Sequence, residues 1–203
     1  MHIYRVTDKE FKEFGTVLNY DTAEIVETAK NIPMPEEGSK YVPSQAEFEP
    51  LAIADSMKLD IFGALPVQMG YCWGYNDTMN ALEWHKNSEV NIAVTDMILL
   101  LGRLQDVENN RYDSANVKAF LMKAGEAVEM YSTTLHFCPI QTEKSGFRCV
   151  VVLPVGTNTP LEDNGGNKLI TAKNKWLLAH EECEKFIARG FVGGIYGENY
   201  KFE

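Results

Sequence analysis

Residues 83–102 read Glu83-Trp84-His85-Lys86-Asn87-Ser88-Glu89-Val90-Asn91-Ile92-Ala93-Val94-Thr95-Asp96-Met97-Ile98-Leu99-Leu100-Leu101-Gly102. The second half of this stretch holds two short apolar runs, 90–94 and 97–102, which are separated by Thr95-Asp96. Short apolar runs joined by a two-residue polar turn predict consecutive strands of a β-hairpin. A polar cluster directly before such strands predicts a site inside a small β-barrel.

The first half of the stretch carries candidate metal ligands. Glu83 and His85 are two residues apart, so on an extended strand both side chains point to the same face. A turn at 86–88 brings Glu89 back onto the same centre. One imidazole flanked by two carboxylates suits a divalent ion such as Zn, Mn, Fe, Co or Ni better than it suits a structural thiolate site. The alternative is that all three are ordinary polar residues on the surface of a strand.

Further short strands and a few helices are predicted around this stretch. The apolar patterns predict strands at 1–6, 68–75, 81–85, 127–133 and 146–152. Helices are predicted at the start of the chain from Asp8, at 21–31 and at 177–188, and loops at 33–43 and 160–167. Short strands at regular spacing are typical of an all-β-dominated sandwich or jelly-roll barrel. We expect a single domain over 1–203, with an N-terminal strand and helix extension (1–45), a barrel core (46–160) and a C-terminal loop and helix (161–203).

Composition narrows the classes of partner. The net charge of −10 argues against a nucleic-acid partner, which needs a basic footprint. No apolar run approaches the roughly 20 residues that span a bilayer. The N-terminal segment is too polar for a signal peptide, so we expect a cytoplasmic location. The four cysteines, at 72, 138, 149 and 183, form no C-x-x-C pair and are expected to be free thiols.

A second group of chemistry-bearing residues lies at 124–139. On the predicted strand, Glu129 and Tyr131 share one face, while Val128 and Met130 share the other. His136 follows inside an apolar Leu-His-Phe step. A histidine in such a step is either a hydrogen-bonded core residue or a ligand.

These residues resemble the two motifs of the cupin superfamily, a fold of double-stranded β-helix (jelly-roll barrel) type. The first cupin motif is typically H-x-H followed after three or four residues by Glu, and here Glu83 replaces the first His. Residues 123–125 and the later His136 are similar to the second motif. Over about residues 65–158 the resemblance implies a cupin barrel with Glu83, His85, Glu89 and His136 as metal ligands, and pairing as a homodimer.

The resemblance also implies an activity. The chain is similar both to sugar-isomerase cupins and to ureidoglycolate lyase-like cupins, and it resembles a functionally uncharacterised cupin family. We expect first a metal-dependent aldose–ketose isomerase acting on a small-molecule substrate, a sugar or sugar acid, through a metal-stabilised enediolate. The alternatives are a lyase acting on a small α-hydroxy acid derivative and a non-catalytic sugar-binding cupin.

Candidate catalytic and substrate-binding residues follow from this activity. Glu129 is the candidate base, expected to face the barrel interior beside His136, although it also fits a solvated strand residue. Tyr75, Tyr131 and Lys175 are the candidate substrate contacts.

Overall fold

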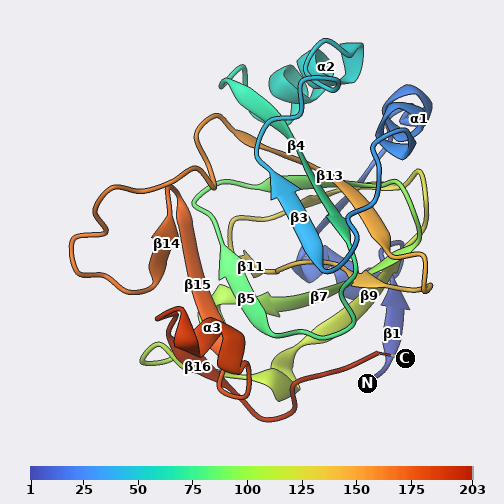
Figure 1. The fold of residues 1–203 in the computed structure, drawn as a ribbon. Helices are drawn as coiled ribbons and strands as arrows, with labels where there is room; N and C mark the ends of the chain where they lie inside the picture. Colours follow the sequence, from blue (N-terminus) through green and yellow to red (C-terminus); the bar gives the residue numbers. More distant parts are fainter. Residues whose placement is uncertain (203) are drawn as a thin grey trace.

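The computed structural model describes residues 1–202, and Glu203, the last residue of the predicted domain, lies outside the described residues. Within that range the chain is built mostly of strands, which curl into a barrel flanked by short helices (Figure 1). This confirms the predicted fold class, an all-β-dominated jelly roll. No helix of the described residues is both long and apolar enough to span a membrane.

The strands of residues 1–202 form three sheets. The first sheet runs β1 (Ile3–Arg5), β9 (Lys118–Met122), β7 (Met97–Arg103) and β11 (Thr134–Leu135), with β12 (Ile140–Gln141) also paired to β7. The second runs β2 (Gly15–Leu18), β10 (Ala127–Met130), β6 (Glu89–Ala93), β13 (Phe147–Pro154), β4 (Val67–Gly74) and β3 (Ser39–Val42). The third runs β14 (Ile170–Ala172), β15 (Lys175–His180), β16 (Gly193–Tyr196) and β8 (Tyr112–Asp113), with β5 (Ala81–Trp84) paired to β15.

Short helices connect these strands. The α-helices are α1 (Ala23–Lys30), α2 (Ala52–Asp60) and α3 (Glu184–Ala188). The 3₁₀ helices are η1 (Lys9–Glu13), η2 (Leu104–Asp106) and η3 (Ser114–Asn116). The predicted helix at 21–31 is therefore confirmed, whereas α2 and β3 were missed by the sequence analysis.

The predicted hairpin of residues 90–102 is wrong, because its two strands belong to different sheets. β6 pairs with β10 and β13, whereas β7 pairs with β9, β11 and β12. The Thr95-Asp96 connection carries the chain from one sheet to the other. It is held by Asp96, whose carboxylate contacts the Lys123 ammonium at 2.6 Å and accepts the Ala124 N–H at 2.9 Å. Because both strands are buried on both faces, neither offers the solvated face of a free hairpin.

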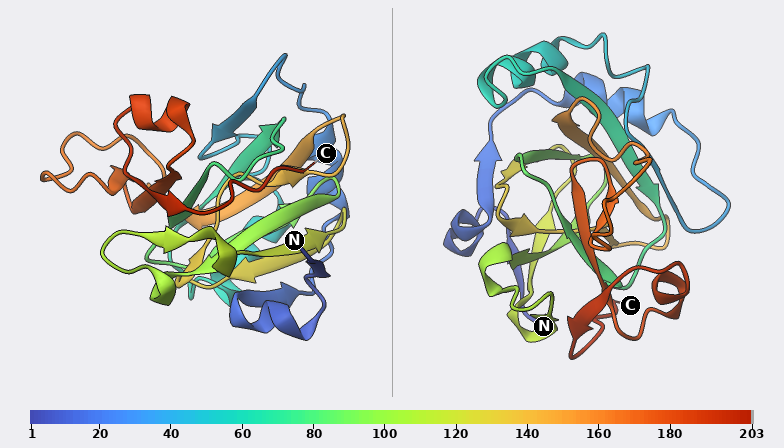
Figure 2. Two further views of the ribbon diagram at one scale, coloured as in Figure 1. Left: turned by 90° about the horizontal axis from the view of Figure 1, so that it is seen from below. Right: turned by 90° about the vertical axis from the view of Figure 1, so that its left-hand side faces the viewer.

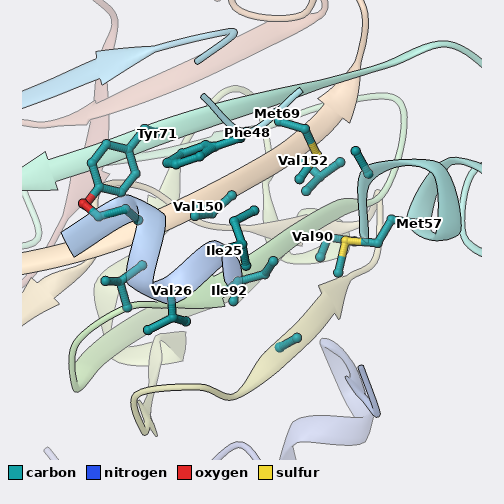
Figure 3. Packing of buried hydrophobic residues seen from close by; sticks show 14 of the residues in the cluster. Ile25, Val26, Phe48, Met57, Met69, Tyr71, Val90, Ile92, Val150 and Val152 are labelled. Atoms are coloured by element: carbon teal, nitrogen blue, oxygen red, sulfur yellow. The ribbon is translucent and has the colours of Figure 1, made fainter. Parts of the chain in front are cut away.

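Apolar side chains fill the space on both faces of the second sheet. Its inner face packs against the first sheet through residues such as Val128, Phe147 and Leu99. Its outer face is covered by α1 and α2. Figure 3 shows Ile25 and Val26 of α1 and Met57 of α2 near the second-sheet residues Val90, Ile92, Val150 and Val152. Burial of these side chains from water is the main term that fixes the helices on the sheet.

The predicted C-terminal helix at 177–188 is also wrong in its first half. Residues 175–180 form β15, which pairs antiparallel with β5 and parallel with β16, and the helix α3 begins only at Glu184. A short apolar run is ambiguous between strand and helix, and here pairing on both sides decides for the strand. The third sheet and α3 lie away from α1 and α2, and the exposed loop before β14 extends away from the barrel (Figures 1 and 2).

Candidate metal centre

The strand β5 places Glu83 and the following His85 on the inner side of the barrel. Leu82 and Trp84 alternate with them and pack into the apolar core on the other face. Glu83 also pairs with His136 across the strands, because the N–H of Glu83 donates to the His136 carbonyl at 2.6 Å and the N–H of His136 donates back at 3.0 Å. Directly opposed residues of antiparallel strands have neighbouring side chains. The backbone therefore places Glu83 and His136 together.

The four side chains that the sequence analysis named as ligands lie within one small volume. The Nε2 atoms of His85 and His136 each lie 3.3 Å from Glu89 Oε2. Glu83 Oε1 lies 3.7 Å from His85 Nε2. Ligand atoms of Glu83, His85 and His136 all lie within 4.8 Å of one another. The four residues are only 1% to 7% exposed.

The backbone fixes which nitrogen of each imidazole faces this volume. His85 Nδ1 lies 2.7 Å from the Asn174 carbonyl oxygen, and His136 Nδ1 lies 3.0 Å from the Thr134 carbonyl oxygen. A carbonyl only accepts hydrogen bonds, so Nδ1 carries the proton in both rings. The neutral rings therefore direct the Nε2 lone pair at the centre, which is the arrangement of metal-binding histidines.

Two carboxylates and two imidazoles are buried together at this centre. Neither Nε2 has a hydrogen-bond partner within residues 1–202, although both are buried against a carboxylate. Burial alone would lower the pKa of His136, but the Glu89 carboxylate beside it raises that pKa to about 9. Burial opposes the ionisation of Glu89 in the same way, and His136 and His85 nevertheless hold its pKa well below the usual range. Two imidazoles and two carboxylates are a donor set that fits a divalent ion of the Mn-to-Zn series.

Two asparagines that the sequence analysis missed support the ligands. The Asn91 amide donates to Glu89 Oε1 at 2.8 Å, which leaves Glu89 Oε2 for the centre. The sequence carries a signal for Asn91, since it is a polar residue two positions after Glu89 in an otherwise apolar strand. Asn174 holds His85 through its carbonyl, and its own side-chain oxygen accepts the Lys86 N–H at 3.0 Å. Asn174 has a φ of 55°, a left-handed conformation that asparagine tolerates better than most residues.

A cavity of about 510 Å³ opens beside the centre, and Glu83, Glu89 and His136 form part of its wall. Lys175 and Tyr75, both predicted substrate contacts, also line it. The Lys175 ammonium forms an ion pair with Glu83 Oε2, so the two oxygens of Glu83 face different partners. Tyr41 of β3 lines the cavity as well, and the sequence analysis missed it because residues 33–43 were predicted to be a loop.

The other two predicted site residues lie elsewhere. Glu129 stands directly opposite Val90 across the β10–β6 pair, and Val90 faces the core under α1 and α2. Glu129 therefore points away from the barrel interior, and its predicted position beside His136 is wrong. The interior face of β10 is taken by Val128 and Met130, because the space that they fill is apolar. Tyr131 is 38% exposed and, within the part of the chain that the structure describes, is not among the residues that line the cavity.

Comparison with solved structures gives only weak likenesses. Oxalate decarboxylase of Bacillus subtilis is similar at a TM-score of 0.36 and 10% identity, over 63% of this chain and 28% of that chain. Vicilin of hazelnut (Corylus avellana) is similar at a TM-score of 0.38 and 7% identity, over 81% of this chain and 41% of that chain. The chain thus spans less than half the length of these structures, and likenesses of this size transfer no activity.

The family comparison is more extensive. No curated protein matches the chain. One family model matches residues 3–200, nearly the whole sequence. The chain therefore belongs to the family described as "Domain of unknown function (DUF4867)".

Proposed function

We propose that this protein is a metal-dependent cupin enzyme in which Glu83, His85, Glu89 and His136 hold one divalent ion, and that it interconverts an aldose and a ketose form of a sugar or sugar acid. One observation carries the metal proposal. Two buried imidazoles are held through Nδ1 by backbone carbonyls and point their Nε2 atoms at one buried carboxylate oxygen, 3.3 Å from each. Such an arrangement is stable only around a positive charge.

The bound ion would act as a Lewis acid towards two adjacent oxygens of the substrate. The protein supplies the cavity beside the ligands, in which the substrate would lie. Aldose–ketose isomerisation also needs a group that takes a proton from one carbon and returns it to the neighbouring carbon. Because Glu129 faces away, we assign this task to Glu83, whose Oε2 lies at the cavity wall against Lys175 while Oε1 faces the ligand cluster.

A lyase acting on a small α-hydroxy acid derivative is the second candidate. The observation in its favour is the Lys175 ammonium, which is 19% exposed at the cavity wall and offers a counter-charge to a substrate carboxylate. The same ammonium also suits a sugar acid, so the product of the reaction must distinguish the two activities.

Elemental analysis and product detection test the proposal together. Protein equilibrated with each of Zn, Mn, Fe, Co and Ni is expected to retain about one ion per chain. Incubation with sugars and sugar acids in deuterated water is expected to give deuterium at C2 and the isomeric product, whereas release of glyoxylate from ureidoglycolate would favour the lyase. Metal bound without turnover of either kind would indicate a sugar-binding protein.

Matched variants locate the ion. Replacing His85 by Gln removes a proposed ligand, whereas replacing the buried His180 by Gln removes a histidine outside the cluster. We expect loss of the ion from H85Q and its retention in H180Q. An unchanged metal content in both H85Q and H136Q would overturn the assignment of the site.

A further inference from the structure

Basic side chains gather around the cavity although the chain as a whole is acidic. The net charge is −10, yet among the described residues that line the cavity the acidic side chains are Glu83 and Glu89, both already assigned to the metal centre. The basic side chains that line it are Lys40, Lys175, Lys185 and Arg189. With a divalent ion bound, the lining would carry a clear positive excess.

Two of these cations, Lys185 and Arg189, belong to residues 183–191, a segment that contributes to the wall of the cavity. Lys185 and Arg189 are four residues apart at α3 and its end, a spacing that places side chains on one side of a helix. The segment is anchored by aromatic packing, since the Phe186 ring meets Phe137 edge-on at 5.8 Å and lies 5.6 Å from Phe191. Aromatic contacts therefore hold the segment in place, and the charges of Lys185 and Arg189 are not needed for this.

Some basic residues of the described chain are neutralised by a carboxylate, and three of the four at the cavity are not. Lys118, Lys123 and Arg5 each contact a carboxylate at 2.9 Å or less. Over residues 1–202, by contrast, Lys40, Lys185 and Arg189 make no ion pair within 4.0 Å, although they line the cavity. Lys40, Lys185 and Arg189 share one cavity, whose two acidic residues are both assigned to the metal centre.

We infer that the cavity selects an anion, namely a small hydroxylated acid with a terminal carboxylate or phosphate, over the neutral sugar of the same size. This inference rests on the proposed function, because the metal centre is taken to bind the hydroxyl or carbonyl oxygens. Lys175 lies beside that centre, and Lys185 and Arg189 offer the charge for the acid group. A neutral sugar would leave Lys185 and Arg189 without an anionic partner, whereas an acid is also attracted by the field that the walls of the cavity focus.

Binding of matched pairs of compounds tests the inference directly. Glucuronate and glucose, or galacturonate and galactose, differ only in a carboxylate in place of a hydroxymethyl group. With metal-loaded protein, calorimetry is expected to show at least tenfold tighter binding of one acid than of its neutral partner, with a matching rise in melting temperature. Glucose 6-phosphate is the matching compound with a terminal phosphate. Whether it or the uronate binds more tightly identifies the terminal group that the cavity prefers.

The K185Q/R189Q double variant is expected to lose most of this preference while keeping its metal content. The K12Q variant, which removes an exposed lysine outside the cavity, is expected to keep the preference. Equal binding of acid and neutral partner, binding of none of the acids, or an unchanged preference in the double variant would overturn the inference. Loss of metal from the wild-type protein would instead overturn the proposed function, so the two failures are distinguishable.

Discussion

The buried histidines of this protein fall into two kinds that differ in the partner of Nδ1. At the candidate metal centre, Nδ1 of His85 and of His136 faces a backbone carbonyl, so the neutral form of each ring carries its proton on Nδ1 and has its lone pair on Nε2. At His180, Nδ1 instead accepts the N–H of Glu182 at 3.2 Å, so the neutral ring carries its proton on Nε2. All three rings are buried. In the proposed function, the backbone partner rather than burial therefore decides which histidine can offer a lone pair to the metal.

The largest expected effect separates the two kinds of histidine. Replacing His136 by Gln should weaken binding of the divalent ion by about 1,000-fold or more, because a first ligand is lost from a preformed site. Replacing His180 by Gln should leave metal affinity within about threefold of wild type, because its Nε2 is a donor. Calorimetric titration of the metal into both variants measures the contrast, and equal losses in the two variants would remove the distinction.

The pH dependence of the metal-free protein should reflect His136. Its pKa is raised from 6.5 to about 9 in the folded chain, chiefly by Glu89 acting against burial. The stabilisation is therefore complete below pH 6.5 and is lost as the pH rises through 9, a change on the order of 3 kcal/mol in the free energy of unfolding.

Urea unfolding between pH 6.5 and 9.5, with a chelator present, measures this change. The metal-loaded protein should show a flat profile in the same window, because the ion replaces the proton. A metal-free protein whose stability rises with pH over this range would contradict the account, and H136Q should flatten the metal-free profile.

Replacing Asn91 shows whether the Glu89 carboxylate must be oriented by a hydrogen bond, as the two histidines are. Replacing Asn91 by Leu removes the hydrogen bond to Glu89 Oε1 and should weaken metal binding by about 10- to 100-fold, the usual range for a group that orients a ligand. Replacing the exposed Asn19 by Leu provides the control. A fall in thermal stability with unchanged metal affinity would show that Asn91 serves packing alone.

Replacing Lys175 should strengthen metal binding, whereas the replacements of His136 and Asn91 should weaken it. Its ammonium is paired with Glu83 and repels a divalent ion at the centre. Replacing Lys175 by Met should therefore tighten metal binding by about tenfold while turnover falls, since a nearby like charge costs on the order of 1 kcal/mol or more at partly buried sites. Weaker metal binding in K175M would mean that Lys175 positions Glu83 as a ligand instead of competing for it.

The smallest effect is expected at Glu129. Because this residue shares a face with Val90, away from the centre, E129Q should change neither metal affinity nor turnover by more than about twofold. Steady-state kinetics and metal titration of E129Q check this. A large loss of turnover with normal metal content would restore Glu129 as a candidate base.

The part of the site that the sequence could predict is the part set by local geometry. Alternation on a strand correctly placed Glu83 and His85 on one face, and it correctly separated Glu129 from Val128 and Met130. Alternation does not indicate which face of a strand points into the barrel. In β10 the inward face carries Val128 and Met130. The prediction that Glu129 faces the interior rested on the expected reaction and not on packing.

The parts that the sequence could not predict depend on contacts between distant segments. Asn174 reaches His85 from 89 residues away, and nothing in its local sequence indicates this. The hairpin prediction failed for the same reason, since Thr95-Asp96 is held by Lys123 and Ala124 of another connection. The sequence of β15 alone does not distinguish a strand from a helix, and the partners that decide for the strand, β5 and β16, are remote in sequence.

Anomalous diffraction from metal-loaded crystals tests the central claim most directly. The account predicts one peak at the absorption edge of the bound metal, with Nε2 of His85, Nε2 of His136 and carboxylate oxygens of Glu89 and Glu83 about 2.0–2.3 Å away. His180 should lie outside the coordination sphere. The account would be contradicted by a metal ion coordinated through Nδ1 or by a peak elsewhere on the chain. It would also be contradicted if no peak appeared after equilibration with each of the five metals.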